Sequence, residues 1–154
     1  MDDKAKKEFV NLEAAKFHDD GGVYLDLVRR IQNDGVCPFC PGNLEKYHTK
    51  PILKEGEYWI MTDNASPYKH AKHHILFIHK KHIENVVDLS DEASQELLEI
   101  VRAEAKKRNI QGGTFYMRFG NTAYTGASVS HLHANLISPD TDNLNREPIL
   151  ARVG

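Results

Sequence analysis

The sequence predicts a single domain of the α+β class, and three observations support this expectation. The chain has 154 residues, which is enough for one domain with its own core and too few for two substantial ones. Apolar side chains recur at helical spacing, among strong helix formers, in residues 3–18 and 90–108. Short runs rich in aromatic and β-branched residues, at 58–61 and 75–78, are typical of strands.

The first 35 residues are expected to form a helical extension that packs on the main domain, residues 36–154. The segment 3–18 carries an apolar stripe and ends at a turn of two aspartates and two glycines. A second amphipathic segment follows and closes at Gly35, because glycine is the residue that most often follows a helix end. Neither predicted helix carries a recognisable chemical motif.

The longest predicted helix begins near Ser90, whose side chain can cap it, and continues to about Arg108. Its apolar residues form one face, and the acids at its start and the bases at its end suit the helix dipole. We therefore expect it to pack on the core without a catalytic role. A strand is predicted at 114–119, and the tail, 138–154, is expected to be a loop with a short strand at 149–150.

Composition predicts a cytoplasmic globular protein. Hydrophobic residues make up 40% of the chain and charged residues 27%, which are ordinary values. The net charge of -2 argues against a protein held to nucleic acid by bulk charge, although Lys80 and Lys81 offer a local basic patch. Nothing resembles a signal peptide or a membrane span, so we expect no membrane partner.

The two cysteines, Cys37 and Cys40, fit two kinds of site. A glutaredoxin-like redox motif uses the same tetrapeptide, Cys-Pro-Phe-Cys, but there it follows a strand and opens a helix. Here a helical pattern precedes the pair and a Pro-Gly turn follows it. This context favours a zinc site in which two thiolates from the turn join two imidazoles from elsewhere. Two free thiols in a turn are the remaining alternative.

Near the end of the chain, the stretch Gly-Ala-Ser-Val-Ser-His-Leu-His-Ala-Asn-Leu-Ile combines small, polar and apolar residues. If it forms a strand, His131, His133 and Asn135 share one face while the apolar residues between them line the other. The small residues from Gly126 to Ser128 let the backbone approach a ligand, and their N–H groups can meet an anion. The pattern indicates the active strand of a phosphate-handling enzyme; a half-exposed strand with chance polar residues is the simpler alternative.

Nine histidines in 154 residues are a surplus that suggests metal or phosphoryl chemistry. A histidine at the end of a strand can ligate a metal, but most histidines in such clusters are simply solvated. Composition does not choose among the five that flank the predicted strand at 75–78, which are His70, His73, His74, His79 and His82.

Four short motifs occur along the chain in a particular order. Residues 64–68 read Asn-Ala-Ser-Pro-Tyr, residues 75–83 Ile-Leu-Phe-Ile-His-Lys-Lys-His-Ile, residues 126–129 Gly-Ala-Ser-Val and residues 131–137 His-Leu-His-Ala-Asn-Leu-Ile. Together they resemble the motifs of the histidine triad superfamily of nucleotidyl hydrolases and transferases, whose core motif is His-φ-His-φ-His-φ-φ, φ being apolar. The first motif is similar to the Asn-x-x-Pro-Tyr of the phosphorylase and uridylyltransferase branches. The resemblance covers about residues 37–138.

This resemblance implies a fold and partners. The fold would be an antiparallel sheet of about five strands, with the helix that begins at Ser90 packed across it and the N-terminal helices added outside. The partners would be a nucleotide substrate and a second copy of the chain, in a homodimer whose sheet continues across the interface.

The resemblance also implies a metal and its ligands. Zinc-bearing members take two ligands from a Cys-x-x-Cys, one from the Lys-Lys-His segment and one from the first histidine of the triad. In this chain these positions are Cys37, Cys40, His82 and His131. Four protein ligands close a tetrahedral shell, so the zinc would be structural and would not activate water.

For the reaction, the resemblance implies that His133, the middle histidine, attacks the α-phosphorus of a nucleotide and forms a covalent nucleotidyl-histidine. Ser128 and backbone N–H groups near Gly126 would hold phosphate oxygens. Asn64 would contact the ribose, and Asn121 a phosphate oxygen or the loop.

Asn135 stands where the hydrolases of this superfamily have their third histidine. A histidine there can protonate a leaving group, whereas an amide only donates and accepts hydrogen bonds. An amide resembles the glutamine of the transferase and phosphorylase branches, so transfer of the nucleotidyl group to phosphate or a phosphorylated acceptor is expected. The alternatives are a hydrolase of the same fold, a nucleotide-binding module without turnover, and a zinc-stabilised interaction or redox protein.

Overall fold

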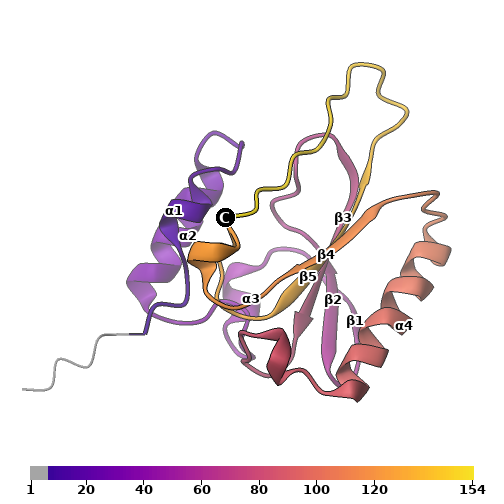
Figure 1. The fold of residues 1–154 in the computed structure, drawn as a ribbon. Helices are drawn as coiled ribbons and strands as arrows, with labels where there is room; N and C mark the ends of the chain where they lie inside the picture. Colours follow the sequence, from indigo (N-terminus) through magenta and orange to yellow (C-terminus); the bar gives the residue numbers. More distant parts are fainter. Residues whose placement is uncertain (1–6) are drawn as a thin grey trace, which may run out of the picture.

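The computed structural model describes residues 7–154, and within them five strands form one antiparallel sheet (Figure 1). The strand order is β1-β2-β3-β5-β4, which confirms the expected α+β class and a sheet of five strands. The strands are β1 (Ile52–Glu55), β2 (Trp59–Asp63), β3 (Ala71–His79), β4 (Thr114–Arg118) and β5 (His133–Pro139). The helices are α1 (Leu12–Ala15), α2 (Val23–Asp34), α3 (Leu44–Tyr47) and α4 (Asp91–Lys107), with 3-10 turns η1 (Val86–Asp88) and η2 (Thr122–Tyr124).

Helix α4 covers one face of the sheet. Its Leu97 and Ile100 are buried in a core cluster that holds side chains from β2, β3 and the β5 segment. The members of this cluster are Trp59, Met61, Ile75, Phe77, Leu97, Ile100, Leu132, Ala134 and Leu136. This burial is what holds α4 against the sheet, because apolar area removed from water is the main stabilising term in folding.

Polar contacts fix α4 to the turn between β1 and β2. The Glu96 carboxylate accepts hydrogen bonds from the backbone N–H groups of Glu57, Tyr58 and Trp59, at 2.7, 2.8 and 2.9 Å. The Trp59 indole Nε1–H donates to the Ala93 carbonyl at 2.7 Å. A Cβ at Gly56 would lie 2.7 Å from the Glu96 carboxyl carbon, so a larger residue there would displace this carboxylate from its three donors.

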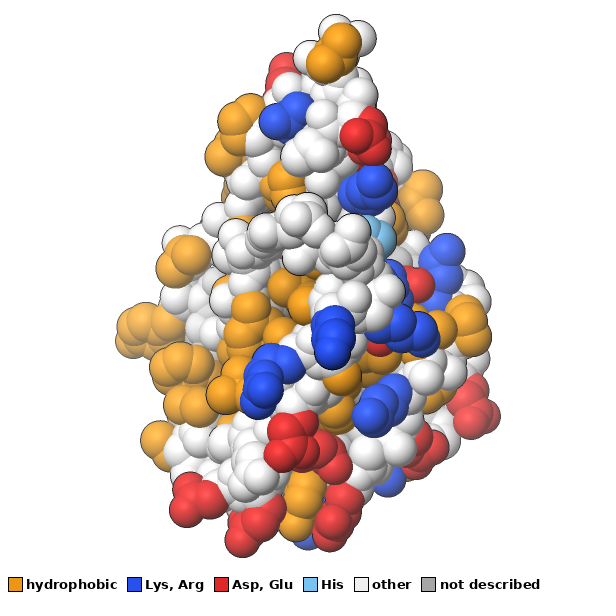
Figure 2. Space-filling view, turned by 90° about the vertical axis from the view of Figure 1, so that its right-hand side faces the viewer, with side chains coloured by type: hydrophobic (Ala, Val, Ile, Leu, Met, Phe, Trp, Pro, Cys, Tyr) orange, Lys and Arg blue, Asp and Glu red, His pale blue; other side chains and the backbone are white. Residues whose placement is uncertain are grey.

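The ends of α4 agree with the sequence. The Ser90 side chain accepts from the Ala93 N–H at 3.1 Å, so it is the N-cap. Acidic residues occupy the first turn and basic ones the last. Figure 2, which shows the side of the molecule that carries α4, has acidic side chains gathered at its lower end and Lys and Arg side chains above them.

The opposite face of the sheet meets the N-terminal elements. Leu76 and Ile78 point to this side and pack with Leu44 of α3. Beside them lies a second cluster that joins the first 35 residues to the rest of the chain, formed by Val10, Ala15, Val28, Ile31, Tyr47 and Val129. In Figure 1, α1 and α2 accordingly lie on the far side of the sheet from α4.

The predicted helix at 3–18 is wrong for most of its described length. Residues 1–6 lie outside the described residues, and only Leu12–Ala15 is helical. The preceding residues pair as a strand: Val10 forms a bridge with Val129, and the Ser130 N–H donates to the Phe9 carbonyl at 2.8 Å. This tertiary pairing satisfies the backbone groups that a helix would otherwise use. Helix α2 is as expected and ends at Gly35, whose φ is 68°.

Three further differences concern short elements. The tail has no strand at 149–150. Strand β1 and helix α3 lacked a sequence signal of their own, because each has only four residues. In the described part of the chain, no helix combines the length and apolar character needed to cross a membrane.

Candidate active site and metal centre

The polar residues of the segment 131–137, which are His131, His133 and Asn135, lie at two different places in and just before strand β5. The apolar residues between them behave as expected, since Leu132, Ala134 and Leu136 are all buried in the core under α4. His133 and Asn135 point the other way and line a cavity. His131 precedes the strand and joins a cluster with the two cysteines. The three polar residues therefore belong to two neighbouring sites, and the Phe39 ring packs edge-on against both His131 and His133.

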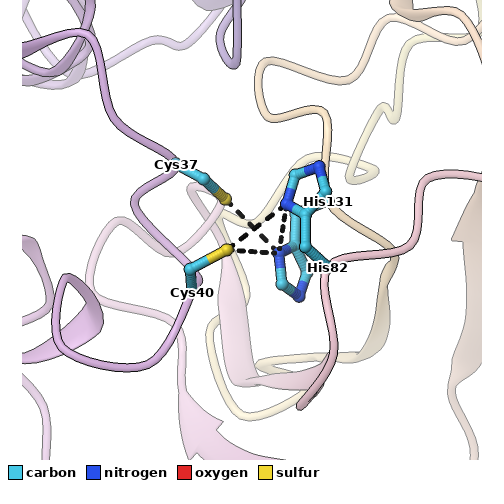
Figure 3. Close-up of side chains that lie close together, drawn as sticks. All are labelled: Cys37, Cys40, His82 and His131. Atoms are coloured by element: carbon cyan, nitrogen blue, oxygen red, sulfur yellow. Dashed lines mark hydrogen bonds between the residues drawn. The ribbon is translucent and has the colours of Figure 1, made fainter.

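The cluster brings together four side chains that are far apart in the sequence, Cys37, Cys40, His82 and His131 (Figure 3). One potential ligand atom from each lies within 4.8 Å of all the others. The Cys37 Sγ is 3.3 Å from the His131 Nδ1, and the Cys40 Sγ is 3.3 Å from the His82 Nδ1. The two Nδ1 atoms are 3.2 Å apart. These are the separations of tetrahedral ligands around one zinc ion, which for bonds of about 2.0–2.3 Å are about 3.3–3.8 Å.

The remaining ring nitrogens of both histidines are tied to acceptors. The His131 Nε2–H donates to the His79 carbonyl at 2.6 Å, and the His82 Nε2–H donates to the Glu84 carboxylate at 2.9 Å. Each contact places the proton on Nε2, so both Nδ1 lone pairs face the cysteines. Outer contacts of this kind orient the histidine ligands of metal sites.

The thiols also fit a metal better than redox chemistry. Burial raises the pKa of Cys37 to about 12, so this thiol stays protonated unless a cation lies beside it. The pair lies in a turn between α2 and α3 rather than at the start of a helix after a strand. The four residues could therefore hold a metal ion, and their donor set is typical of zinc.

The cavity that contains His133 lies on the face of the sheet opposite α4, between the sheet and the N-terminal elements. Residues from most of the chain line it, including several that sequence reasoning did not single out. The polar residues are His18, Tyr24, Tyr47, His48, Asn64, Ser66, Tyr68, His74, Arg118, Ser128, His133, Asn135 and Arg152.

His133 is held with one nitrogen free. Its Nδ1–H donates to the His131 carbonyl at 2.6 Å, which leaves the Nε2 lone pair toward the cavity. Burial lowers the pKa of His133 to about 4, and the charge of Arg118 acts in the same direction. The imidazole is therefore neutral near pH 7, which is the form that acts as a nucleophile.

Asn135 belongs to a hydrogen-bonded chain with His74 of β3. The His74 Nε2 lies 2.9 Å from the Asn135 Oδ1 and 3.2 Å from the Asn64 Nδ2. The His74 Nδ1 accepts from the Tyr68 N–H at 3.1 Å. The Asn64 oxygen in turn accepts from the Ser66 N–H at 2.8 Å, so Asn64 is fixed at the edge of the cavity.

Ser128 and Gly126 form another part of the cavity wall. The Ser128 hydroxyl is hydrogen-bonded to the Tyr24 hydroxyl of α2. Gly126 has a φ of 74°, a conformation that side chains rarely adopt, which explains the glycine there. The N-terminal extension thus contributes side chains to the cavity, although its sequence showed no chemical motif.

Asn121 is the one predicted substrate contact that the structure does not bring to this cavity. It is exposed, and its side-chain oxygen caps η2 by accepting from the Ala123 N–H at 2.9 Å. It lines a different hollow, together with residues of the 8–13 segment.

Two residues near His133 were not assigned a role from the sequence, since His74 was only one of five histidines considered and Arg118 was not considered. His74, Leu76 and Ile78 are every second residue of β3 and therefore project from the same face of the sheet. This position in the strand, rather than composition, places His74 on the cavity face. Arg118 closes β4 and lies directly opposite His133 on β5. An arginine at the end of an otherwise apolar run was its only sequence signal.

The comparisons with known proteins agree on one superfamily. The family model described as scavenger mRNA decapping enzyme C-term binding matches residues 36–148. A histidine triad (HIT) family hydrolase from Clostridium thermocellum shares 28% identity, with a TM-score of 0.52 over 75% of this chain and 96% of that one. No curated protein matches the chain.

Two more distant structures share the fold. A histidine triad nucleotide-binding protein from Candida albicans has 20% identity and a TM-score of 0.56, over 76% of this chain and 86% of that one. A zinc-bound histidine triad family protein from Mycobacterium smegmatis has 17% identity and a TM-score of 0.50, over 68% of this chain and 78% of that one.

Proposed function

Because this chain belongs to the scavenger mRNA decapping enzyme C-terminal family, and with it to the histidine triad superfamily, we propose that it is a nucleotidyl transferase or phosphorylase. Its substrate would be a nucleoside polyphosphate or nucleotide conjugate, and the reaction would pass through a covalent nucleotidyl-histidine. The observation that carries the proposal is His133, which is neutral, tied at Nδ1 and free at Nε2 in the cavity.

In the first step the His133 Nε2 attacks the α-phosphorus. The N–P bond forms, the bond from phosphorus to the leaving oxygen breaks, and that oxygen takes the electron pair. The imidazole keeps its Nδ1 proton, and the His131 carbonyl stabilises the positive charge that develops on the ring. In the second step an acceptor oxygen attacks phosphorus and releases Nε2, so ping-pong kinetics are expected.

Other residues of the cavity would position the substrate. The Ser128 hydroxyl and the backbone N–H groups from Gly126 onward would hold phosphate oxygens. Asn64, at the end of β2, would contact the ribose. We do not assign Asn121 a substrate contact, because its side chain caps η2 outside this cavity.

Asn135 favours transfer to a phosphate acceptor over hydrolysis, because a carboxamide can neither protonate a leaving group nor remove a proton from water. Hydrolysis is the second candidate, and its support is the resemblance to the HIT family hydrolase from Clostridium thermocellum. Product analysis with and without inorganic phosphate separates the two. A phosphorylase forms a nucleoside diphosphate only when phosphate is present.

We also propose that Cys37, Cys40, His82 and His131 hold a structural zinc ion. With all four positions filled by protein, the metal would supply cross-linking and no activated water. It would join the turn after α2 to the residues just before β5, and so fix the start of the strand that carries His133.

A homodimer is proposed through β4, which is an edge strand. Its outer side has backbone groups that a second copy can pair with, and Phe115 and Phe119 are 36% and 50% exposed. On the side of the molecule shown in Figure 2, hydrophobic side chains gather along one margin. Sedimentation equilibrium should give twice the chain mass of 17.5 kDa, and a monomer would contradict the proposal.

The experiment that tests the reaction is intact-protein mass spectrometry after a short incubation with diadenosine tetraphosphate or UDP-glucose. We expect an added AMP or UMP in the native protein and none in His133→Gly. The matched control is His70→Asn, a half-buried histidine outside the cavity lining, which should still form the adduct. Tight nucleotide binding with neither adduct nor turnover would instead establish a binding module.

A further inference from the structure

Arg118 lies in the cavity beside the proposed nucleophile. It pairs directly with His133 across β4 and β5, and residues opposite each other in an antiparallel pair project from the same face of the sheet. Both side chains line the cavity. The charge of Arg118 is close enough to lower the pKa of His133.

The guanidinium has no acidic partner among residues 7–154. Its contacts are all neutral oxygens: the Tyr116 hydroxyl at 3.4 Å, the Tyr68 hydroxyl at 3.5 Å and the Arg152 carbonyl. Seven other Lys or Arg residues in the described part of the chain make ion pairs. A half-buried positive charge that faces a cavity without a carboxylate is an unusual arrangement, because burying an unpaired charge costs free energy.

The Arg152 carbonyl marks where an oxygen binds this guanidinium. It accepts from the Arg118 Nη2 at 2.7 Å and from Nε at 3.3 Å, so two N–H groups on one edge of the guanidinium point at this single oxygen. The same edge can bind two oxygens of a phosphate or carboxylate. The same carbonyl lies beside Gly126, where a Cβ would come within 3.3 Å of it. The tail therefore places a neutral oxygen between Arg118 and the segment from Gly126 to Ser128, which is predicted to bind phosphate.

We propose that Arg118 binds an anionic group of the substrate, next to the phosphoryl group that His133 attacks, at the position now taken by the Arg152 carbonyl. This inference rests on the proposed function and deepens it by naming a substrate class. The group displaced from phosphorus, or the acceptor that replaces it, carries a negative charge of its own, as a further phosphate does. The tail segment around Arg152 yields this position when the anion binds.

The charge of Arg118 suits both directions of the reaction. When the bond from the α-phosphorus to the leaving oxygen breaks, that oxygen receives the electron pair and gains a negative charge, which a nearby guanidinium stabilises. In the second step the same guanidinium holds an anionic acceptor, whose oxygen forms the new bond to phosphorus as the bond to the His133 Nε2 breaks. Asn135 cannot protonate the leaving oxygen, so a charged leaving group needs a cation at this place.

Calorimetric titration of the zinc-loaded protein with two pairs of nucleotides tests the proposal. The pairs are AMP with α,β-methylene-ADP, and UMP with α,β-methylene-UDP, in which the second member adds one unreactive phosphate. We expect the native protein to bind the diphosphate of one pair about 10- to 100-fold more tightly than the monophosphate. In Arg118→Met this preference should disappear while the monophosphate affinity stays within about threefold, and Arg118→Lys should keep part of it.

A shortened chain that ends at residue 148 separates anion binding from anchoring of the tail. It removes residues 149–154, none of which belongs to a core cluster. Because the Arg152 side chain also lines the cavity, Arg152→Ala in the full chain is measured beside it and its own effect on the diphosphate preference is subtracted. If Arg118 binds the anion, the shortened chain keeps or increases the diphosphate preference. If Arg118 only holds the tail, the shortened chain and Arg118→Met behave alike, which overturns the inference.

The other outcomes are also decisive. An Arg118→Met variant that loses both nucleotides of a pair equally places the arginine on the α-phosphate and overturns the proposal. An adduct on His133 in the native protein, without any diphosphate preference, overturns this inference and leaves the proposed function intact. If the native protein forms no adduct and binds no nucleotide, both this inference and the proposed function are wrong. Zinc content and thermal midpoint, measured on each variant, identify loss of fold.

Discussion

The His74 Nε2 and the Asn135 Oδ1 lie 2.9 Å apart across the neighbouring strands β3 and β5. Since the His74 Nδ1 accepts from the Tyr68 N–H, the imidazole proton is on Nε2 and Asn135 is the acceptor. The structure gives the Asn135 Nδ2 no partner among the described residues, yet no fully buried side-chain N or O there lacks one. The amide NH2 therefore reaches the cavity, oriented by His74, where it can donate to a phosphate oxygen.

Asn135→Asp should abolish most of the reaction, because it replaces this donor by a negative oxygen that repels phosphate. We expect adduct formation on His133 to slow by about 100-fold or more, the usual cost of losing one preorganised donor. Quenched-flow mass spectrometry with the better nucleotide measures the rate. The matched control is Asn145→Asp in the exposed tail, which makes the same chemical change. Equal rates of adduct formation in the two variants would show that Asn135 has no role in the reaction.

Loss of the metal should destabilise the protein and slow its reaction together. If zinc binds with a Kd about 1,000-fold below its free concentration, it stabilises the fold by about 4 kcal/mol. For a chain of this size that corresponds to roughly 8–16 °C in Tm. We expect Cys40→Ser to lose the zinc and this stability, as seen by metal analysis and calorimetry. A Cys40→Ser protein with unchanged Tm and full activity would argue against a structural metal.

Stability should fall at acidic pH in a way that depends on His74. Burial lowers the pKa of His74 below its ordinary value of 6.5, and a proton on Nδ1 would oppose the Tyr68 N–H. The unfolded chain therefore takes up the proton first. The contribution of His74 is fully present above pH 6.5 and is lost as the pH falls towards the lowered pKa of the folded state.

Urea unfolding of the native protein and of His74→Gln, between pH 7.5 and pH 5, measures this effect. The difference in unfolding free energy between the two proteins should shrink as the pH falls. Other histidines, including His48, also have lowered pKa values from burial, but their effect is common to both proteins and cancels. A difference that stays constant with pH would show that His74 does not titrate in this way.

Glu96 should matter for stability and not for chemistry. Its carboxylate accepts three backbone N–H groups of the turn before β2, and α4 lies on the face of the sheet opposite the cavity. Glu96→Ala leaves these donors without their acceptor, which should lower the unfolding free energy by about 2–3 kcal/mol. Glu99→Ala, on the exposed part of the same helix, should change it by less than about 0.5 kcal/mol. Equal effects in denaturant titrations would contradict this assignment.

The parts of the fold that sequence predicted are those with a local signal. Helix α4 has a cap, one apolar face and charges that suit its dipole, and β5 alternates between the core and the cavity. Residues 9–11 have no such local signal for their conformation, because they pair with the 128–130 segment, more than a hundred residues later. A helical pattern in the sequence could not reveal that pairing.

For the candidate site, the sequence predicted the positions of residues only where they belong to motifs of the family. The four candidate metal ligands come together as the resemblance implies, whereas the Asn121 side chain caps η2 outside the cavity. His74 and Arg118 became candidates only when strand pairing put them beside Asn135 and His133. Their roles depend on register across the sheet, which composition and spacing along one strand do not encode.

The contact between Tyr24 and Ser128 joins positions that are 104 residues apart, and it tests whether the N-terminal extension takes part in binding. Tyr24→Phe removes the hydroxyl that holds the Ser128 side chain, while the ring and its packing remain. We expect nucleotide affinity, measured by calorimetry, to fall about fivefold, the equivalent of one hydrogen bond of about 1 kcal/mol. The Tm should change little. Tyr124→Phe, whose ring is 80% exposed, is the control, and equal affinities for the two variants would confine the extension to a packing role.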